Sequence, residues 1–152
     1  MRQTPNEYKR LGMADTVKHR PVYRNIRITQ LSHYRLPAPG LVSILHRISG
    51  ALLFILLPFV IWLFDASITS EVSYAQFASL FSAGWAGLPG WFFKLVVLAL
   101  IWAYVQHFIA GLRHIYMDVT HATGLGFGRS SAFVTLIATA ILTIALGAKL
   151  FI

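Results

Sequence analysis

Residues 91–117 read WFFKLVVLALIWAYVQHFIAGLRHIYM, and this stretch decides the fold class. A helix needs about 20 mostly apolar residues to cross a hydrocarbon core roughly 30 Å thick. The stretch exceeds that length and is interrupted by few charges, so it predicts a transmembrane helix. Because it is longer than the core requires, we expect it to tilt or to project beyond the bilayer.

Two further stretches have the same character. The first covers about residues 44–64 and contains GALLFILLPFVIWLF, in which Pro58 is expected as a tolerated kink. The second covers about residues 131–152 and reads SAFVTLIATAILTIALGAKLFI from residue 131. We therefore predict an all-α membrane protein, with three transmembrane helices forming one domain over residues 41–152.

The composition excludes most other classes of protein. The chain has 152 residues, of which 57% are hydrophobic and 12% are charged, against a norm of roughly 25% charged in soluble domains. An ordinary soluble domain or a disordered chain is therefore excluded. There is no cysteine, so this chain alone cannot form a disulfide, a thiolate zinc site or a cysteine-ligated iron–sulfur cluster.

The formal net charge of +8 is concentrated at the N-terminus. Residues 1–40 form a basic tail without the apolar core of a secretory signal, so we expect a retained tail; a cleaved, arginine-rich transit peptide is the alternative. The connection 65–90 has no Lys or Arg, whereas the connection after the second helix is expected to hold Arg113 and Arg129. The positive-inside rule then places the tail and the second connection in the cytoplasm. The basic charge predicts membrane lipid, and no nucleic acid, as the partner.

Two histidines stand where a membrane helix rarely has them. His107 and His114 are seven residues apart, nearly two helical turns, and therefore share one face. A neutral imidazole is a common axial ligand of haem iron, but the spacing does not decide which histidine would bind. The plainer interpretation is a hydrogen bond to a neighbouring helix. A proton relay in a small transporter subunit is a third interpretation.

A second polar group marks the start of the first helix. Ser43, His46 and Arg47 stand at i, i+3 and i+4 and share a face, with Ser49 close behind. Together they could hold a polar headgroup whose tail lies in lipid, and Arg47 could pair with a haem propionate. The plainer interpretation is a snorkelling arginine with Ser43 as the helix N-cap.

A glycine run at Gly124, Gly126 and Gly128 is interpreted as a flexible turn between the second and third helices. No strand precedes it, so a nucleotide-binding loop is excluded.

These two polar groups lie in recognisable motifs. Residues 43–50 read SILHRISG, and residues 107–118 read HFIAGLRHIYMD. Both resemble the signatures of the cytochrome b556 membrane-anchor subunit family of succinate dehydrogenase, in the expected order on the first and second helices. The resemblance extends from about Arg20 to the third helix.

The resemblance implies a role for each matching residue. His114 matches the axial ligand of haem b iron, with the other axial histidine coming from a second membrane-anchor subunit. His46 and Arg47 match residues near the haem propionates. Ser43 and Arg47 match quinone-binding residues, and Ile44 lines the same pocket. His107 matches a position that is often histidine without being the ligand.

The implied function is that of a membrane anchor in succinate:quinone oxidoreductase, respiratory complex II. The chain would form half of a heterodimeric haem-binding helix bundle and pass electrons from the iron–sulfur subunit to a quinone, expected to be ubiquinone. Succinate would be oxidised on the flavoprotein subunit. The expected location is the bacterial inner membrane, with the mitochondrial inner membrane as the alternative. A haem-free structural anchor and the anchor of a fumarate reductase remain alternatives.

Overall fold

The structure is a computed structural model that describes residues 35–152. Leu36–Ile152 form one compact unit. Most of the expected basic tail, residues 1–34, lies outside the described residues, and its last residues belong to the first described helix.

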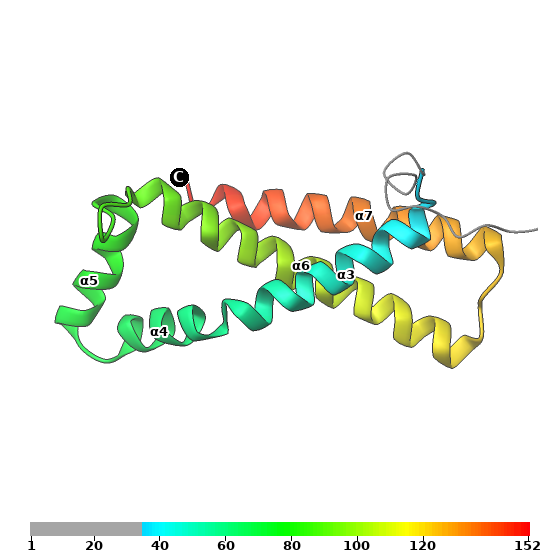
Figure 1. The fold of residues 1–152 in the computed structure, drawn as a ribbon, viewed down its shortest axis with the longest axis horizontal. Coiled ribbons are helices and arrows are strands. Elements are labelled where there is room, and N and C mark those ends of the chain that lie inside the picture. The colour runs from blue at the N-terminus through cyan, green and yellow to red at the C-terminus, as the bar shows by residue number, and fades with distance from the viewer. Residues whose placement is uncertain (1–34) are drawn as a thin grey trace, which may run out of the picture. The chain divides into compact units, whose positions relative to one another are not determined.

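The described residues form five helices and no extended strand (Figure 1). Three of the helices are long and apolar enough to cross a membrane, which confirms the predicted all-α membrane fold. The helices are α3 (Ala38–Ile55), α4 (Leu57–Ile68), α5 (Glu71–Ser82), α6 (Gly90–Thr120) and α7 (Leu125–Ala148).

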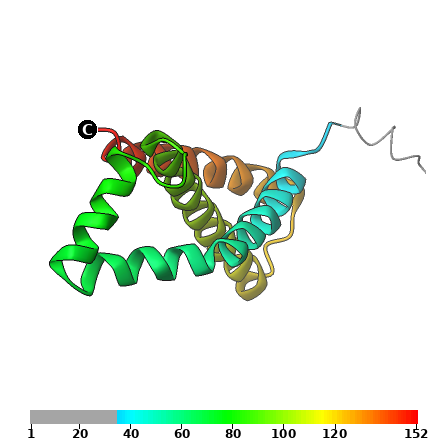
Figure 2. The ribbon, with the colours of Figure 1, turned by 60° about the vertical axis from the view of Figure 1, so that its left-hand side comes forward.

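The first apolar stretch forms two helices instead of one kinked helix. Helix α3 begins at Ala38, earlier than expected, and the helical path is interrupted at Leu56, whose φ and ψ are −87° and 0°. Pro58 explains the interruption, because it has no N–H for the carbonyl of Phe54 and its ring crowds that carbonyl. Beyond the break, α4 leads away from α6 and packs against α5 (Figure 2).

The connection between the first and second crossings contains a helix that the sequence did not predict. Helix α5 begins with a capping box, in which the Ser70 hydroxyl accepts from the Ser73 amide at 3.1 Å and the Ser73 hydroxyl accepts from the Ser70 amide at 3.0 Å. The chain then turns through Gly84 and Gly87, both with positive φ, before α6 begins. Helix α5 thus lies between α4 and α6 in the chain and packs against both.

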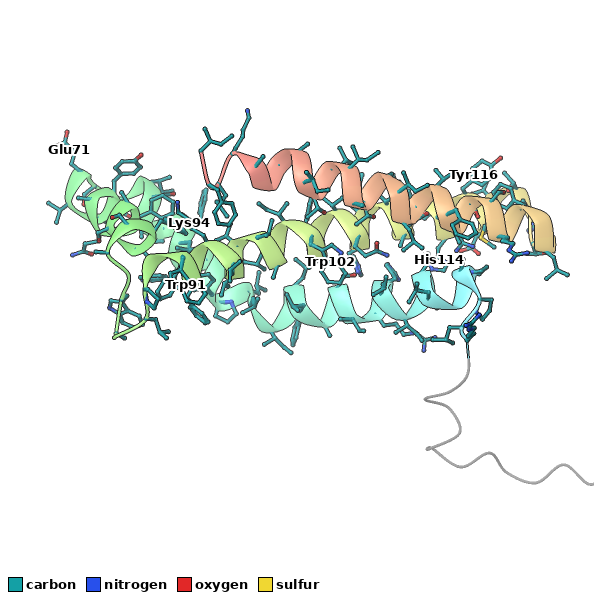
Figure 3. The ribbon with its side chains drawn as sticks, turned by 90° about the horizontal axis from the view of Figure 1, so that it is seen from above. Glu71, Trp91, Lys94, Trp102, His114 and Tyr116 are labelled. Carbon is teal, nitrogen blue, oxygen red and sulfur yellow. The ribbon has the colours of Figure 1, made fainter. Side chains whose placement is uncertain are left out.

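Helix α6 is the centre of the unit and packs against both α3 and α7 (Figures 1 and 3). The three helices share a fully buried cluster of Val42, Ala110 and Ala132. The two alanines allow the backbones to approach closely, as small residues do between membrane helices. This cluster lies toward the end where α3 begins, α6 ends and α7 begins, which we call the α6–α7 loop end.

The glycine run is not a turn over its whole length, which corrects the sequence interpretation. Helix α6 ends at Thr120, His121 adopts a left-handed conformation, and α7 begins at Leu125. Only Gly124 precedes α7; Gly126 and Gly128 lie inside its first turns. Packing overcomes the low helix propensity of glycine here, since Phe127 stacks on Tyr116 with ring centroids 5.5 Å apart.

Candidate functional site

Three histidines from two helices meet between α3 and α6. The ring of His46, from α3, lies 4.2 Å from the ring of His107 and 5.2 Å from the ring of His114, measured between centroids. His114 lies on the side of α6 that faces α3 (Figure 3). The expected shared face of His107 and His114 is therefore present, and His46 contacts both.

His107 is held by the backbone of the opposite helix. Its Nδ1 lies 3.1 Å from the carbonyl oxygen of His46. A carbonyl oxygen only accepts hydrogen bonds, so in this bond Nδ1 carries the proton and Nε2 keeps its lone pair. The plainer interpretation, a histidine hydrogen-bonded to a neighbouring helix, therefore describes His107. The same bond leaves Nε2 in the tautomer that a metal requires.

Ser49 and Gly50, at the end of the first motif, form the surface against which His107 packs, which we call the His107 seat. Ser49 is fully buried; its hydroxyl donates to the His46 carbonyl at 2.9 Å and lies 3.5 Å from Nδ1 of His107. A Cβ added at Gly50 would lie 2.8 Å from Cε1 of His107, so only glycine admits the ring in this place. Sequence reasoning missed this role of Gly50, and its signal was the motif position itself.

The three imidazoles do not form a metal cluster by themselves. Across residues 35–152, no group of three or more histidine and acidic side chains is arranged to hold a metal ion. The rings of His46 and His107 are nearly parallel, 15° apart, so their nitrogens do not converge on one point. A haem bound by one histidine of this chain would use only one of these imidazoles.

The other predicted site residues lie one helical turn apart on α3. Helix α3 begins at Ala38, so Ser43 lies inside the helix, and its expected alternative role as the N-cap is wrong. Ile44 and Arg47 are exposed, and Ser43 is half-buried. The structure thus presents these side chains toward whatever lies beside α3, instead of enclosing them within the chain.

Arg113 was expected in the connection after the second helix, but it lies inside α6 as a buried cation. It is 9% exposed; its Nε donates to the Ser131 hydroxyl at 2.9 Å, and its Nη2 donates to the Gly128 carbonyl at 3.1 Å. Both partners belong to α7, so Arg113 joins α6 to α7 on a different face from the histidines. In the sequence, only the position of Arg113 beside His114 in the second motif pointed to a role inside the helix.

A family model described as "Succinate dehydrogenase/Fumarate reductase transmembrane subunit" matches residues 16–146. The chain belongs to this family. As a member of the succinate dehydrogenase/fumarate reductase transmembrane subunit family with three apolar crossings, it is a multi-pass membrane protein and a subunit of an oxidoreductase complex.

Several members of this family are similar over most of the chain. A protein of Coxiella burnetii named succinate dehydrogenase cytochrome b556 subunit is 30% identical over 118 residues, covering 77% of this chain and 89% of that protein. Proteins of the same name from Paracoccus denitrificans and Rickettsia felis are 30% and 29% identical, covering 70% and 69% of this chain and 73% of each relative. The resemblance inferred from the two motifs is confirmed.

Proposed function

We propose that this chain is the cytochrome b membrane-anchor subunit of succinate dehydrogenase, and that it passes electrons from an iron–sulfur subunit to a quinone. The observation that carries the proposal is the contact of His107, in the second motif, with Gly50 and the His46 carbonyl, in the first. Three relatives carry the name cytochrome b556 subunit, which supports haem b as the cofactor. Succinate would be oxidised on a flavoprotein subunit, because this chain has no cysteine for clusters and forms no flavin-binding fold in its described part.

The residues fit a haem. Histidines that bind a metal usually donate their second ring N–H to a backbone carbonyl or carboxylate, which fixes the ring and raises its basicity. The bond from Nδ1 of His107 to the His46 carbonyl is of this kind. When bound, haem b would hold one electron beside the quinone site. The resemblance assigned the iron to His114, but this hydrogen bond favours His107 as the axial ligand, with His114 as the alternative.

The chain supplies half of the haem site. One imidazole of this chain would bind the haem iron, and the other histidine ligand would come from a second membrane-anchor subunit. His46 and Arg47 would hold the propionates: His46 lies against both histidines of α6, and the exposed Arg47 guanidinium can form a bidentate pair with a carboxylate.

The quinone would bind along the exposed edge of α3. Ser43 and Arg47 lie one turn apart, so a hydroxyl and a guanidinium can reach the same headgroup. Ser43 would donate a hydrogen bond to a carbonyl oxygen, and Arg47 would favour the negative charge that develops there during reduction. Ile44 would contact the ring. Protons would come from water at the membrane surface, and ubiquinone is the expected quinone.

The proposed orientation places the α6–α7 loop end in the cytoplasm. The basic tail precedes α3 in the sequence, and Arg129 lies near the start of α7, so the positive-inside rule favours the cytoplasm for this end. The iron–sulfur and flavoprotein subunits would bind on the same side, close to the histidines and Arg47, which gives electrons a short path. The bacterial inner membrane is the expected location. The family description covers succinate dehydrogenases and fumarate reductases alike, so a fumarate reductase is the second candidate.

The decisive experiment is a reduced-minus-oxidised spectrum of the purified membrane complex, recorded for the wild type, His107→Ala and His114→Ala. The proposal expects a low-spin b-type spectrum in the wild type, its loss or conversion in His107→Ala, and its retention in His114→Ala. The opposite pattern for the two variants would assign the iron to His114 instead. A wild-type complex without haem absorption would contradict the cytochrome proposal and favour a haem-free anchor.

A further inference from the structure

A second groove lies between α6 and α7, on a different side of α6 from the histidines. Its volume is about 640 Å³, and Arg113 lines it together with Ile109, Leu112, Tyr116, Ser130 and Val134. Tyr116 lies on the α7 side of α6, whereas His114 lies on the α3 side (Figure 3). The groove is therefore separate from the proposed haem and quinone sites.

The groove contains an incompletely paired cation. Arg113 is 9% exposed, and its two hydrogen-bond partners, the Ser131 hydroxyl and the Gly128 carbonyl, are both neutral. A guanidinium has five N–H donors, so these two bonds leave several donors for a ligand. A buried charge in a membrane protein is unfavourable unless it is paired, so the site calls for an anion.

Arg113 lies near the edge of the hydrocarbon core, within reach of the lipid headgroups. Helix α6 has 31 residues, which gives a length of about 46 Å against a core of about 30 Å. If α6 is centred in the membrane, each end extends about 8 Å beyond the core. Arg113 lies seven residues before the end at Thr120, or about 10 Å. It therefore lies close to the boundary between acyl chains and headgroups.

We propose that the α6–α7 groove binds one membrane phospholipid, with its phosphodiester held by Arg113 and its headgroup beside Ser130. One acyl chain would lie along Ile109, Leu112 and Val134. A free anion would gain nothing from these apolar walls, whereas a molecule that is anionic at one end and apolar at the other uses the whole groove. The proposed site takes part in neither haem binding nor quinone reduction.

The first test counts the phospholipids that remain bound to the purified complex after delipidation, by native mass spectrometry. Arg113→Gln removes the charge and keeps side-chain N–H donors. Arg129→Gln removes the same charge from an exposed residue of α7 that lines another groove. We expect the wild type and Arg129→Gln to retain one phospholipid more than Arg113→Gln. Equal retention in all three complexes would overturn the proposal.

A second variant keeps the Arg113 contacts intact. Ser130 is exposed, and its hydroxyl donates only to the carbonyl of its own helix at Phe127. Ser130→Trp should fill the groove without disturbing the bonds from Arg113 to α7, and should remove the same phospholipid. A Ser130→Trp complex that is fully assembled and retains this lipid would contradict the proposed location.

Lipid add-back distinguishes the possible anions. Delipidated wild-type complex is titrated with phosphatidylglycerol, with diacylglycerol of the same chains, and with inorganic phosphate, while its thermal unfolding is followed. We expect stabilisation by phosphatidylglycerol alone, and an affinity at least about tenfold weaker in Arg113→Gln. Equal stabilisation by inorganic phosphate would overturn the lipid proposal in favour of a simple anion site. Loss of the second membrane subunit from Arg113→Gln, with an unchanged lipid count, would overturn it in favour of a partner carboxylate.

Discussion

The imidazole of His46 lies flat against the imidazole of His107, with ring centroids 4.2 Å apart and planes 15° from parallel. The stack joins the first motif to the second across the contact between α3 and α6. The hydrogen bond from Nδ1 of His107 to the backbone carbonyl of His46 fixes the same pair a second time. A substitution that displaces one of these rings should therefore displace the other.

The two glycines beside these rings allow a matched test of the seat. A Cβ at Gly50 would lie 2.8 Å from Cε1 of His107, whereas a Cβ at Gly111 would lie 3.8 Å from Nε2 of His46. We expect Gly50→Ala to displace His107, to destabilise the complex by about 1–3 kcal/mol through overpacking, and to shift the haem potential. Gly111→Ala should do neither. Redox titration and thermal unfolding of both variants check this; equal effects would count against the seat.

The quinone proposal predicts unequal effects for two residues on one turn of α3. Arg47→Leu removes a charged donor, at a cost of roughly 1.5–3 kcal/mol or about ten- to a hundredfold in succinate-to-quinone activity. Ser43→Ala removes a neutral donor and should cost about 0.5–1.5 kcal/mol. Activity with an artificial acceptor that takes electrons before the quinone should survive in both. Wild-type quinone reduction by both assembled variants would place the quinone site in the partner subunits.

The orientation can be tested with single cysteines, since the natural chain has none. Ala75 is exposed on α5, and Thr123 is exposed in the loop between α6 and α7. An impermeant thiol reagent added to intact cells should label Ala75→Cys and leave Thr123→Cys unlabelled until the membrane is opened. Labelling of Thr123→Cys alone would reverse the orientation.

The hydrogen bond between Arg113 and Ser131 predicts that two adjacent serines contribute differently to the stability of the complex. Ser131 accepts from the buried Nε of Arg113 at 2.9 Å, whereas Ser130 donates to the carbonyl of Phe127 at 3.2 Å on an exposed surface. Ser131→Ala leaves a buried donor without its partner and should destabilise the complex by about 1–3 kcal/mol. Ser130→Ala should lie within about 0.5 kcal/mol of the wild type. Thermal unfolding of both variants in the same detergent measures the difference. Equal losses of stability would contradict the role given to the Arg113–Ser131 hydrogen bond.

Hydropathy and length predicted the three crossings because they measure the transfer of a segment into lipid. The bounds of α6 follow this rule closely. The rule did not locate the break at Leu56, because a proline in a membrane helix can kink it or end it, and the neighbouring packing decides which. Helix α5 was missed because it is short and partly polar. The early start of α7 depends on the packing of Phe127 against Tyr116. Helix propensities describe single residues, so they could not predict this contact.

For the site, helical periodicity predicted that His107 and His114 share a face, and the structure agrees. It could not predict that His46 stacks on His107, because that depends on how α3 crosses α6. Nor could it predict the bond to a backbone carbonyl, since every residue has a carbonyl and only the helix crossing selects one. The functional roles of His114, His46, Ser43, Ile44 and Arg47 remain predictions.

The bonds between Arg113 and α7 also have a consequence for biosynthesis. An arginine inside a membrane helix is unfavourable during insertion, by up to about 2.5–3.5 kcal/mol at the helix centre and by less near the boundary, where Arg113 lies. The chain that satisfies Arg113, at Gly128 and Ser131, emerges from the ribosome shortly afterwards and across a short loop. Helices α6 and α7 are therefore expected to enter the membrane together as a hairpin in which Arg113 already has two hydrogen-bond partners. Separating them with a long inserted loop should slow insertion, even where the finished protein would tolerate it.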